Sequence, residues 1–246
     1  SSAPGSGKST LAYPLTAHLN AVLSGRPEKT FAVDSSTGLI PSMKAGPSSL
    51  PESPISAGGG GDEVAICVGL DGWHHSRKEL DKFEDPDHAH FRRGAAFTFN
   101  LPSYLSFVQR LRIPLSPLPP PRAIPFPTFN HALKDPTPSP ISILPPHRIV
   151  IIEGLYTMLD RPGWRECAEM MDLRVWVETD RQVCRERVIR RNFEAGIVDD
   201  LKACEERVVD ASDMVNGDEV RQNRYLPTDI IEPKDDLSLG NGNAST

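Results

Sequence analysis

Hydrophobic residues along this 246-residue chain fall into short continuous runs that alternate with segments of helical spacing. Residues 63–70, 148–154 and 173–178 are apolar at most positions, as in strands of a parallel sheet that helices cover on both faces. This alternation predicts an α/β fold with a doubly wound parallel sheet and a last short strand at residues 225–231. Helices are predicted at residues 9–23, 76–83, 102–112, 180–193 and 199–214.

Three segments lack this pattern. Residues 35–61 are rich in Ser, Pro and Gly, too polar and flexible to offset the entropy cost of ordering, and predict a flexible insertion. Residues 113–147 hold 12 of the 24 prolines, which predicts a long loop or lid without regular structure. Residues 234–246 are polar and predict a disordered tail, so that residues 1–233 form one domain.

The composition narrows the possible classes of function. A hydrophobic content of 38% is enough for a core, and a net charge of -6 argues against a general nucleic-acid-binding surface, because such surfaces cluster Lys and Arg. No apolar run approaches the roughly eighteen residues that span a bilayer, which argues against an integral membrane protein. The four cysteines have no metal-ligand spacing and predict reduced, buried thiols of a cytoplasmic protein.

The first ten residues contain most of a phosphate-binding loop. Residues 5–9 (GSGKS) match the closing part of the nucleotide signature G-x-x-x-x-G-K-[ST], although Ser2 stands where that signature opens with glycine. In such loops backbone N–H groups surround the phosphates, the lysine bridges the terminal phosphates and the hydroxyl ligates magnesium. The predicted ATP ligands are Gly5, Ser6, Gly7, Lys8, Ser9 and Thr10, with Ser9 also on Mg²⁺. The alternative is a Gly-Ser turn that caps the following helix.

Two carboxylates stand at the ends of predicted strands, where ligands gather in parallel α/β folds. Asp71 would accept the proton of an attacking hydroxyl, a contribution of about 10²–10⁴-fold in rate. Glu153 would reach magnesium directly or through water. The alternatives are local caps, in which Asp71 closes the turn at Gly72 and Glu153 caps the next helix.

The helix predicted at residues 180–193 is rich in arginine. Arg187, Arg190 and Arg191 are three and four residues apart, so they project from one face and could close over the phosphates during catalysis. The alternative is a solvated face with nearby glutamates as partners of the arginines.

Aromatic and basic residues around Asp71 predict a pocket for a polar, small-molecule acceptor that could carry negative charge. The predicted acceptor residues are Trp73, His74, Arg92, Arg93, Phe129 and His131. Phe129 and His131 could equally be loop residues that pack on the core. A metal site at His74 and His75 is not expected, because no third ligand has suitable spacing.

Residues 4–10 (PGSGKST), 71–74 (DGWH) and 151–154 (IIEG) together resemble the uridine kinase, phosphoribulokinase and pantothenate kinase family of P-loop kinases. Three further segments look more narrowly like a little-characterised fungal and bacterial branch of that family, at residues 92–99, 129–136 and 190–197. Residues 213–217 (DMVNG) are similar to an Asn-Asp-x-x-Asn stretch of the same branch.

The resemblance implies a P-loop NTPase fold with ATP and Mg²⁺ as cofactors. It implies that Lys8 and Ser9 contact the phosphates and the metal, that Asp71 is the catalytic base, and that the arginines of residues 187–191 lie in the lid region. The chain departs from the family in Ser2, in the insertion at residues 35–61 and in the absence of the first strand that should lead into the loop. We therefore expect an incomplete version of a larger gene product, whose upstream segment could also include a targeting signal.

Together these features predict an ATP-dependent small-molecule kinase. It would transfer the γ-phosphoryl group to a hydroxyl of a nucleoside, sugar or pantothenate-like acceptor, with neither nucleic acid nor membrane as partner. The alternatives are a P-loop ATPase, a nucleotide-binding regulatory protein or a degenerate pseudokinase. The oligomeric state leaves no signature in the sequence.

Overall fold

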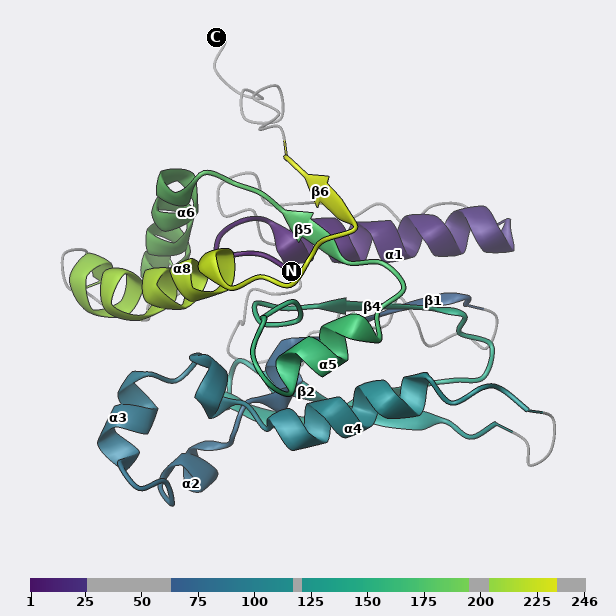
Figure 1. Ribbon diagram of the computed structural model, residues 1–246, viewed down its shortest axis with the longest axis horizontal. Coiled ribbons are helices and arrows are strands. Elements are labelled where there is room, and N and C mark those ends of the chain that lie inside the picture. The colour runs from purple at the N-terminus through teal and green to yellow at the C-terminus, as the bar shows by residue number, and fades with distance from the viewer. Residues whose placement is uncertain (26–62, 117–120, 195–203, 234–246) are drawn as a thin grey trace, which may run out of the picture.

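The computed structural model describes residues 1–25, 63–116, 121–194 and 204–233. The predicted insertion at residues 35–61 and the predicted tail at residues 234–246 lie outside these ranges. The fold is α/β, with parallel strand pairs and helices on both sides of them (Figure 1). In the described part of the chain, no helix is long and apolar enough to cross a membrane.

Two pairs of parallel strands form the centre of the fold. Strand β1 (Ala65–Gly69) pairs with β4 (Ile149–Glu153), and β5 (Val175–Val177) pairs with β6 (Asp229–Ile231). Ser1 lies against both pairs: its backbone bonds to Val175 and Val177 of β5, and its hydroxyl donates to the carbonyl oxygen of Leu155, just beyond β4. The phosphate loop therefore starts between the two strand pairs.

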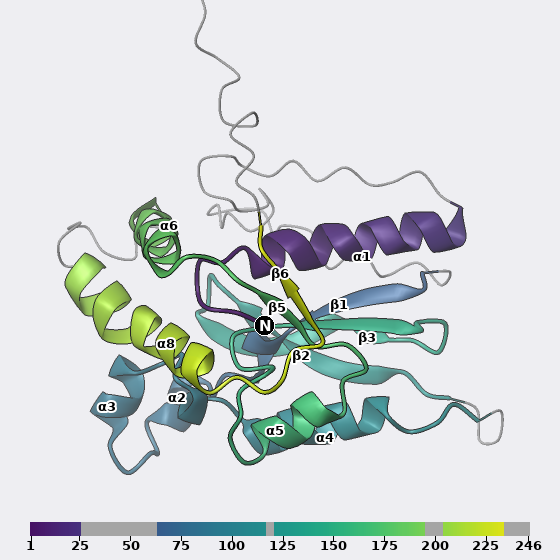
Figure 2. The ribbon, with the colours of Figure 1, turned by 45° about the horizontal axis from the view of Figure 1, so that its top comes forward.

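Helices cover the two faces of the β1–β4 pair. Helix α1 (Lys8–Ser24) packs on one face, while α4 (Leu101–Leu111) and α5 (Trp164–Glu169) lie on the other (Figures 1 and 2). Helix α6 (Arg181–Glu194), the π-helix η5 (Cys204–Asp213) and α8 (Met214–Gln222) stand at the end of the molecule where α1 begins (Figure 2). The helix predicted at residues 199–214 thus ends eight residues later than expected, at Gln222.

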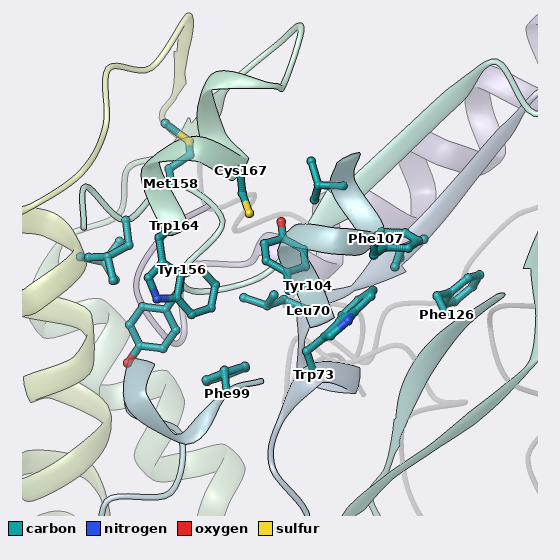
Figure 3. Packing of buried hydrophobic residues seen from close by; sticks show 14 of the residues in the cluster. Leu70, Trp73, Phe99, Tyr104, Phe107, Phe126, Tyr156, Met158, Trp164 and Cys167 are labelled. Carbon is teal, nitrogen blue, oxygen red and sulfur yellow. The ribbon is translucent and has the colours of Figure 1, made fainter. Parts of the chain in front are cut away.

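The main core lies between the β1–β4 pair and helices α4 and α5, and it is rich in aromatic side chains (Figure 3). Trp73 packs edge-on against Tyr104, with ring centroids 5.3 Å apart, and lies 4.7 Å from the ring of Phe107. Trp164 and Tyr156 continue this cluster towards α8, with ring centroids 5.6 Å apart. Buried aromatic area of this kind fixes the turn that follows β1.

The proline-rich stretch is the clearest difference from the sequence prediction. Instead of an irregular loop it contains an antiparallel hairpin of β2 (Ile124–Asn130) and β3 (Asp135–Ile143). A two-stranded hairpin has only edge strands, so half of its N–H groups need no partner and proline is tolerated there. The pairing of the two strands shifts register between Pro125 and Pro127, two residues that have no N–H group to donate to the ladder.

Two further differences concern short helices. The helix predicted at residues 76–83 is limited to α2 (Arg77–Leu80), which Ser76 and Glu79 begin with a capping box. Helix α3 (Pro86–Phe91) follows it and was not predicted, although Asp85 caps it and proline occupies its first turn. The η3 turn (Leu70–Trp73) and the η4 turn (Ala96–Thr98) complete the segment between β1 and α4.

Candidate active site

The phosphate loop has the backbone geometry that its glycines predict. Gly5 and Gly7 adopt φ values of 77° and 89°, which side chains other than glycine rarely tolerate. A Cβ atom on Gly5 would also lie only 2.9 Å from the Cγ2 of Val188 on α6. Gly7 is the N-cap of α1, and Lys8 is its first residue, followed by Ser9 and Thr10. The loop thus places the N-terminus of a long helix behind the predicted phosphate position, as anion sites require.

Lys8 folds back over the loop, and its ammonium donates to the carbonyl oxygen of Ala3 at 2.9 Å. Burial lowers the pKa of Lys8, whereas the charges of Glu153 and Asp71 act to raise it. The ammonium is therefore within electrostatic reach of both Asp71, the predicted base, and Glu153, the predicted metal ligand. A lysine held in this way is a ready counter-ion for an incoming polyphosphate.

The two carboxylates lie together because β1 and β4 are parallel and in register, with Gly69 opposite Glu153. The hydroxyl of Ser9 donates to Oε2 of Glu153 at 3.2 Å, so this carboxylate faces the phosphate loop. Burial and the nearby charge of Asp71 raise the pKa of Glu153, while Lys8 and the Ser9 hydroxyl act to lower it. Asp71 is exposed, two residues beyond the end of β1.

Ser9 and Glu153 are the donor set available to a magnesium ion. Among the described residues there is no group of three or more His, Cys, Asp or Glu side chains that would hold a metal by itself. That arrangement fits Mg²⁺, because this ion usually keeps several waters and is held by one or two carboxylates together with substrate phosphates. A hydroxyl and a carboxylate already in contact therefore suit a Mg²⁺ ion that arrives with a nucleotide.

Aromatic rings lie next to the turn that carries Asp71. His74 lies between Phe99, at 4.0 Å between ring centroids, and Phe129 of the hairpin, at 5.2 Å. The Nδ1 atom of His74 is 2.8 Å from the carbonyl oxygen of Asp71, so Nδ1 carries the proton. Burial lowers the pKa of His74, which favours a neutral imidazole. His131 follows at the exposed hairpin tip, 5.3 Å from the Phe129 ring.

The other predicted acceptor residues are placed differently. Trp73 is 2% exposed and points into the core (Figure 3), because the η3 turn buries Leu70 and Trp73, three residues apart, and leaves Asp71 exposed. Arg92 donates to Oδ1 of Asn216 on α8 at 2.9 Å. Arg93 donates to Oδ1 of Asp135 on the hairpin at 2.7 Å. The structure therefore brings His74, Phe129 and His131 together, whereas the two arginines bind other parts of the chain.

Helix α6 lies beside the phosphate loop and carries the three predicted lid arginines. Arg187 donates from Nη1 to the carbonyl oxygen of Gly5 at 3.3 Å. Arg191, four residues later on the same face, is close enough to Lys8 to lower its pKa. Arg190 is exposed. Two of the three arginines thus already lie at the loop.

Several residues that support the loop have no recognisable signal in the sequence. Thr179 donates to the carbonyl oxygen of Ser6 at 3.2 Å, and Arg221 of α8 binds the carbonyl of Thr179 and a carboxylate oxygen of Glu178. Gly217 packs on the loop so closely that a Cβ atom there would lie 3.0 Å from Cδ of Pro4. Thr179 is 173 residues from Ser6, and Arg221 is 42 and 43 residues from Thr179 and Glu178, so no local pattern reveals these contacts.

A further, partly buried carboxylate, Asp213, lies at the end of η5. Asn192 of α6 donates to Oδ2 of Asp213, the first residue of the stretch at residues 213–217, at 3.3 Å. Burial raises the pKa of Asp213, while Arg191 acts to lower it. This polar contact connects the arginine-bearing helix to the start of α8.

A phosphate loop at a helix start, next to two carboxylates at parallel strand ends, defines the P-loop kinase class. The chain belongs to the phosphoribulokinase and uridine kinase family, whose model matches residues 74–210. Its relatives include the ATP-dependent kinase-like protein notR' of Aspergillus versicolor, 40% identical over 164 residues that cover 67% of this chain and 93% of that protein.

Two solved structures have the same fold. YFH7 of Saccharomyces cerevisiae, described as a P-loop kinase candidate with a circular permutation, aligns with a TM-score of 0.60 and 30% identity over 71% of this chain and 59% of that one. A candidate fructose transport system kinase from Silicibacter sp. TM1040 aligns with a TM-score of 0.68 and 24% identity over 94% of this chain and 86% of that one. The second likeness is evidence for the fold alone.

Proposed function

We propose that this protein is an ATP- and Mg²⁺-dependent kinase that transfers the γ-phosphoryl group to a hydroxyl of a nucleoside, sugar or pantothenate-like small molecule. The observation that carries this proposal is the convergence of Lys8, Ser9, Glu153 and Asp71 at one end of the parallel strands. Phosphoryl transfer asks a protein mainly for positioning and charge compensation, and these four side chains supply both.

Each residue has a distinct role in this proposal. Lys8 and the backbone N–H groups of the loop would hold the terminal phosphates of ATP. Ser9 and Glu153 would hold the Mg²⁺ ion, which when bound neutralises charge on the transferred group. Asp71 is exposed on the acceptor side, where its carboxylate would orient the hydroxyl and accept its proton. The aromatic rings of His74 and Phe129 would pack against the acceptor.

Helix α6 supplies the remaining positive charge in the proposal. Arg187 and Arg191 lie next to the phosphate loop. In this proposal their side chains turn towards the phosphates when ATP binds. Arg190 lies outside this set, and we assign it no contact with ATP. Positive side chains that are already in place around the transferring phosphoryl group need to move little during the reaction.

An acceptor screen tests the proposal. The protein is incubated with Mg²⁺, ATP and a panel of hydroxyl metabolites, and products are followed by mass spectrometry together with ADP release. The proposal expects a phosphorylated metabolite and ADP formed in equal amounts. ADP that forms at the same rate without any acceptor would instead support a P-loop ATPase, and ATP binding without any turnover would support a regulatory protein or pseudokinase.

A further inference from the structure

The β2–β3 hairpin lies directly over the end of β1, and its tip is fastened by one ion pair. Nη2 of Arg93 and Oδ1 of Asp135 are 2.7 Å apart, and the two side chains are only 17% and 30% exposed. Arg93 belongs to the turn after α3, whereas Asp135 is the first residue of β3. The pair therefore joins two segments that are 42 residues apart in the chain.

The guanidinium of Arg93 binds more than this carboxylate. Nη1 donates to the carbonyl oxygen of Lys134 at 2.6 Å, and Nη2 also donates to the carbonyl oxygen of His75 at 2.9 Å. Lys134 has a φ of 53°, the left-handed conformation that closes the hairpin tip. One planar fork thus holds the hairpin tip and the segment that follows Asp71, which a lysine could not do with the same geometry.

Asp135 in turn holds the start of α2. Its Oδ1 accepts the backbone N–H of Arg77 at 2.9 Å, in addition to the bond from Arg93. Burial acts to raise the pKa of Asp135, but these two hydrogen bonds and the charges of both arginines outweigh it, and the pKa lies below its usual value. The carboxylate is therefore ionised at neutral pH and keeps its bond to Arg93.

This arrangement also places the aromatic side of the acceptor space. The Cζ atom of Arg93 lies 5.6 Å from the ring centroid of Phe129, which in turn lies 5.2 Å from the ring of His74. Because His74 is bonded to the carbonyl of Asp71, the position of Phe129 relative to Asp71 depends on where the hairpin tip is held.

We propose that Arg93 and Asp135 form a latch that holds the hairpin over the acceptor side of Asp71, and that this latch sets the affinity for the acceptor without touching it. The inference rests on the proposed function, because it takes the acceptor to bind between Asp71 and the hairpin. Arg93 and Asp135 are then positioning residues. This differs from the sequence prediction, in which Arg93 contacts the acceptor directly.

Variants of Arg93 and of Asp135 distinguish a positioning role of Arg93 from a direct contact between Arg93 and the acceptor. If the latch sets acceptor affinity, Arg93→Gln and Asp135→Asn should each raise the acceptor KM by about ten-fold, with kcat and the KM for ATP changed much less. The double variant should be no worse than either single one, because both remove the same interaction. Arg93→Lys should recover part of the affinity. If Arg93 instead binds the acceptor, Asp135→Asn would leave the affinity unchanged or improve it, which would overturn the latch.

A matched control uses another ion pair of the same chemistry. Arg112 and Asp172 are also 2.7 Å apart, but their side chains are 49% and 80% exposed and lie at the far end of α4. Arg112→Gln should leave the acceptor KM unchanged, as expected for an exposed pair that joins the end of α4 to the segment after α5 and not to the hairpin tip.

Hydrogen exchange of the unliganded protein tests the latch without any need for turnover. Amides of residues 129–135 should exchange about ten-fold faster in Arg93→Gln and Asp135→Asn than in the wild type, and at the wild-type rate in Arg112→Gln. Unchanged exchange rates in Arg93→Gln and Asp135→Asn would overturn the latch, whether or not the protein phosphorylates an acceptor. A wild-type protein that phosphorylates no acceptor would overturn the proposed function instead, so the two failures are distinguishable.

Discussion

Replacing Gly72 by alanine should push the hairpin away from the end of β1 and weaken use of the acceptor. Gly72 is buried directly beneath β2. A Cβ atom at this position would lie 2.5 Å from the carbonyl carbon of Pro127 and 3.0 Å from the backbone nitrogen of Thr128. Both are backbone atoms, so no side-chain rotation can relieve the overlap.

The size of the effect follows from these distances. To reach ordinary van der Waals contact, the carbonyl carbon of Pro127 must retreat from its 2.5 Å position by about 1 Å. Phe129 follows two residues later, so the aromatic side of the acceptor space moves with it. A displacement of about 1 Å in a positioning element costs on the order of 10²-fold in rate, and the overlap itself costs about 1–3 kcal/mol in the free energy of unfolding.

Steady-state kinetics with the acceptor varied at saturating ATP measure this effect. Gly72→Ala should lose on the order of 10²-fold in kcat/KM for the acceptor, while the Kd for ATP stays close to that of the wild type. Gly25→Ala at the end of α1 is the control, since its Cβ would meet nothing within 4 Å; its φ of 64° makes the substitution cost stability, but the acceptor kinetics should stay at the wild-type level. Wild-type acceptor kinetics in a folded Gly72→Ala protein would refute the reasoning.

Three further predictions concern charge and packing. Lys8→Met should raise the Kd for ATP in calorimetry by about 10- to 100-fold, because a charge-assisted bond contributes ~1.5–3 kcal/mol, whereas the exposed Lys78→Met should not. Burial and the charge of Asp71 raise the pKa of Glu153 in the folded protein. The protonated Glu153 therefore contributes to the free energy of unfolding at low pH, and this contribution is lost as the pH rises through the raised pKa. Metal binding needs the ionised form, so Mg²⁺-dependent ATP affinity should increase as the pH rises above the usual carboxyl range, and an equally steep increase in Glu153→Gln would contradict this. Tyr104→Phe should leave the free energy of unfolding unchanged or raise it by ~1 kcal/mol, because the buried Tyr104 hydroxyl has no hydrogen-bond partner among the described residues; a loss above ~1 kcal/mol in urea melts would show an overlooked partner.

Local signals in the sequence predicted the phosphate-loop geometry and the strand ends that carry the two carboxylates. The loop glycines, Lys8 and Ser9 belong to one short motif. Asp71 follows shortly after the apolar run of β1, and Glu153 is the last residue of β4. Parallel strands end at the same edge of a sheet, so the position of both carboxylates at the ends of predicted strands was enough to place them near the loop.

The acceptor side could not be predicted in the same way. The prolines concealed the hairpin, because a composition count does not show that edge strands tolerate residues without an N–H group. The contacts of Arg92 and Arg93 depend on Asn216 and Asp135, which are 124 and 42 residues away. Trp73 precedes His74 directly, and only the η3 turn decides which of the two faces the core.

The rate of phosphoryl transfer by Asp71→Asn tests the central claim most directly. The variant keeps the shape of the side chain and removes the carboxylate that would accept the hydroxyl proton. Transfer to the acceptor should fall by about 10²–10⁴-fold while the Kd for Mg²⁺–ATP stays close to the wild-type value, and Asp87→Asn, an exposed substitution on α3, should leave the rate unchanged. Transfer by Asp71→Asn at the wild-type rate would contradict the proposed mechanism.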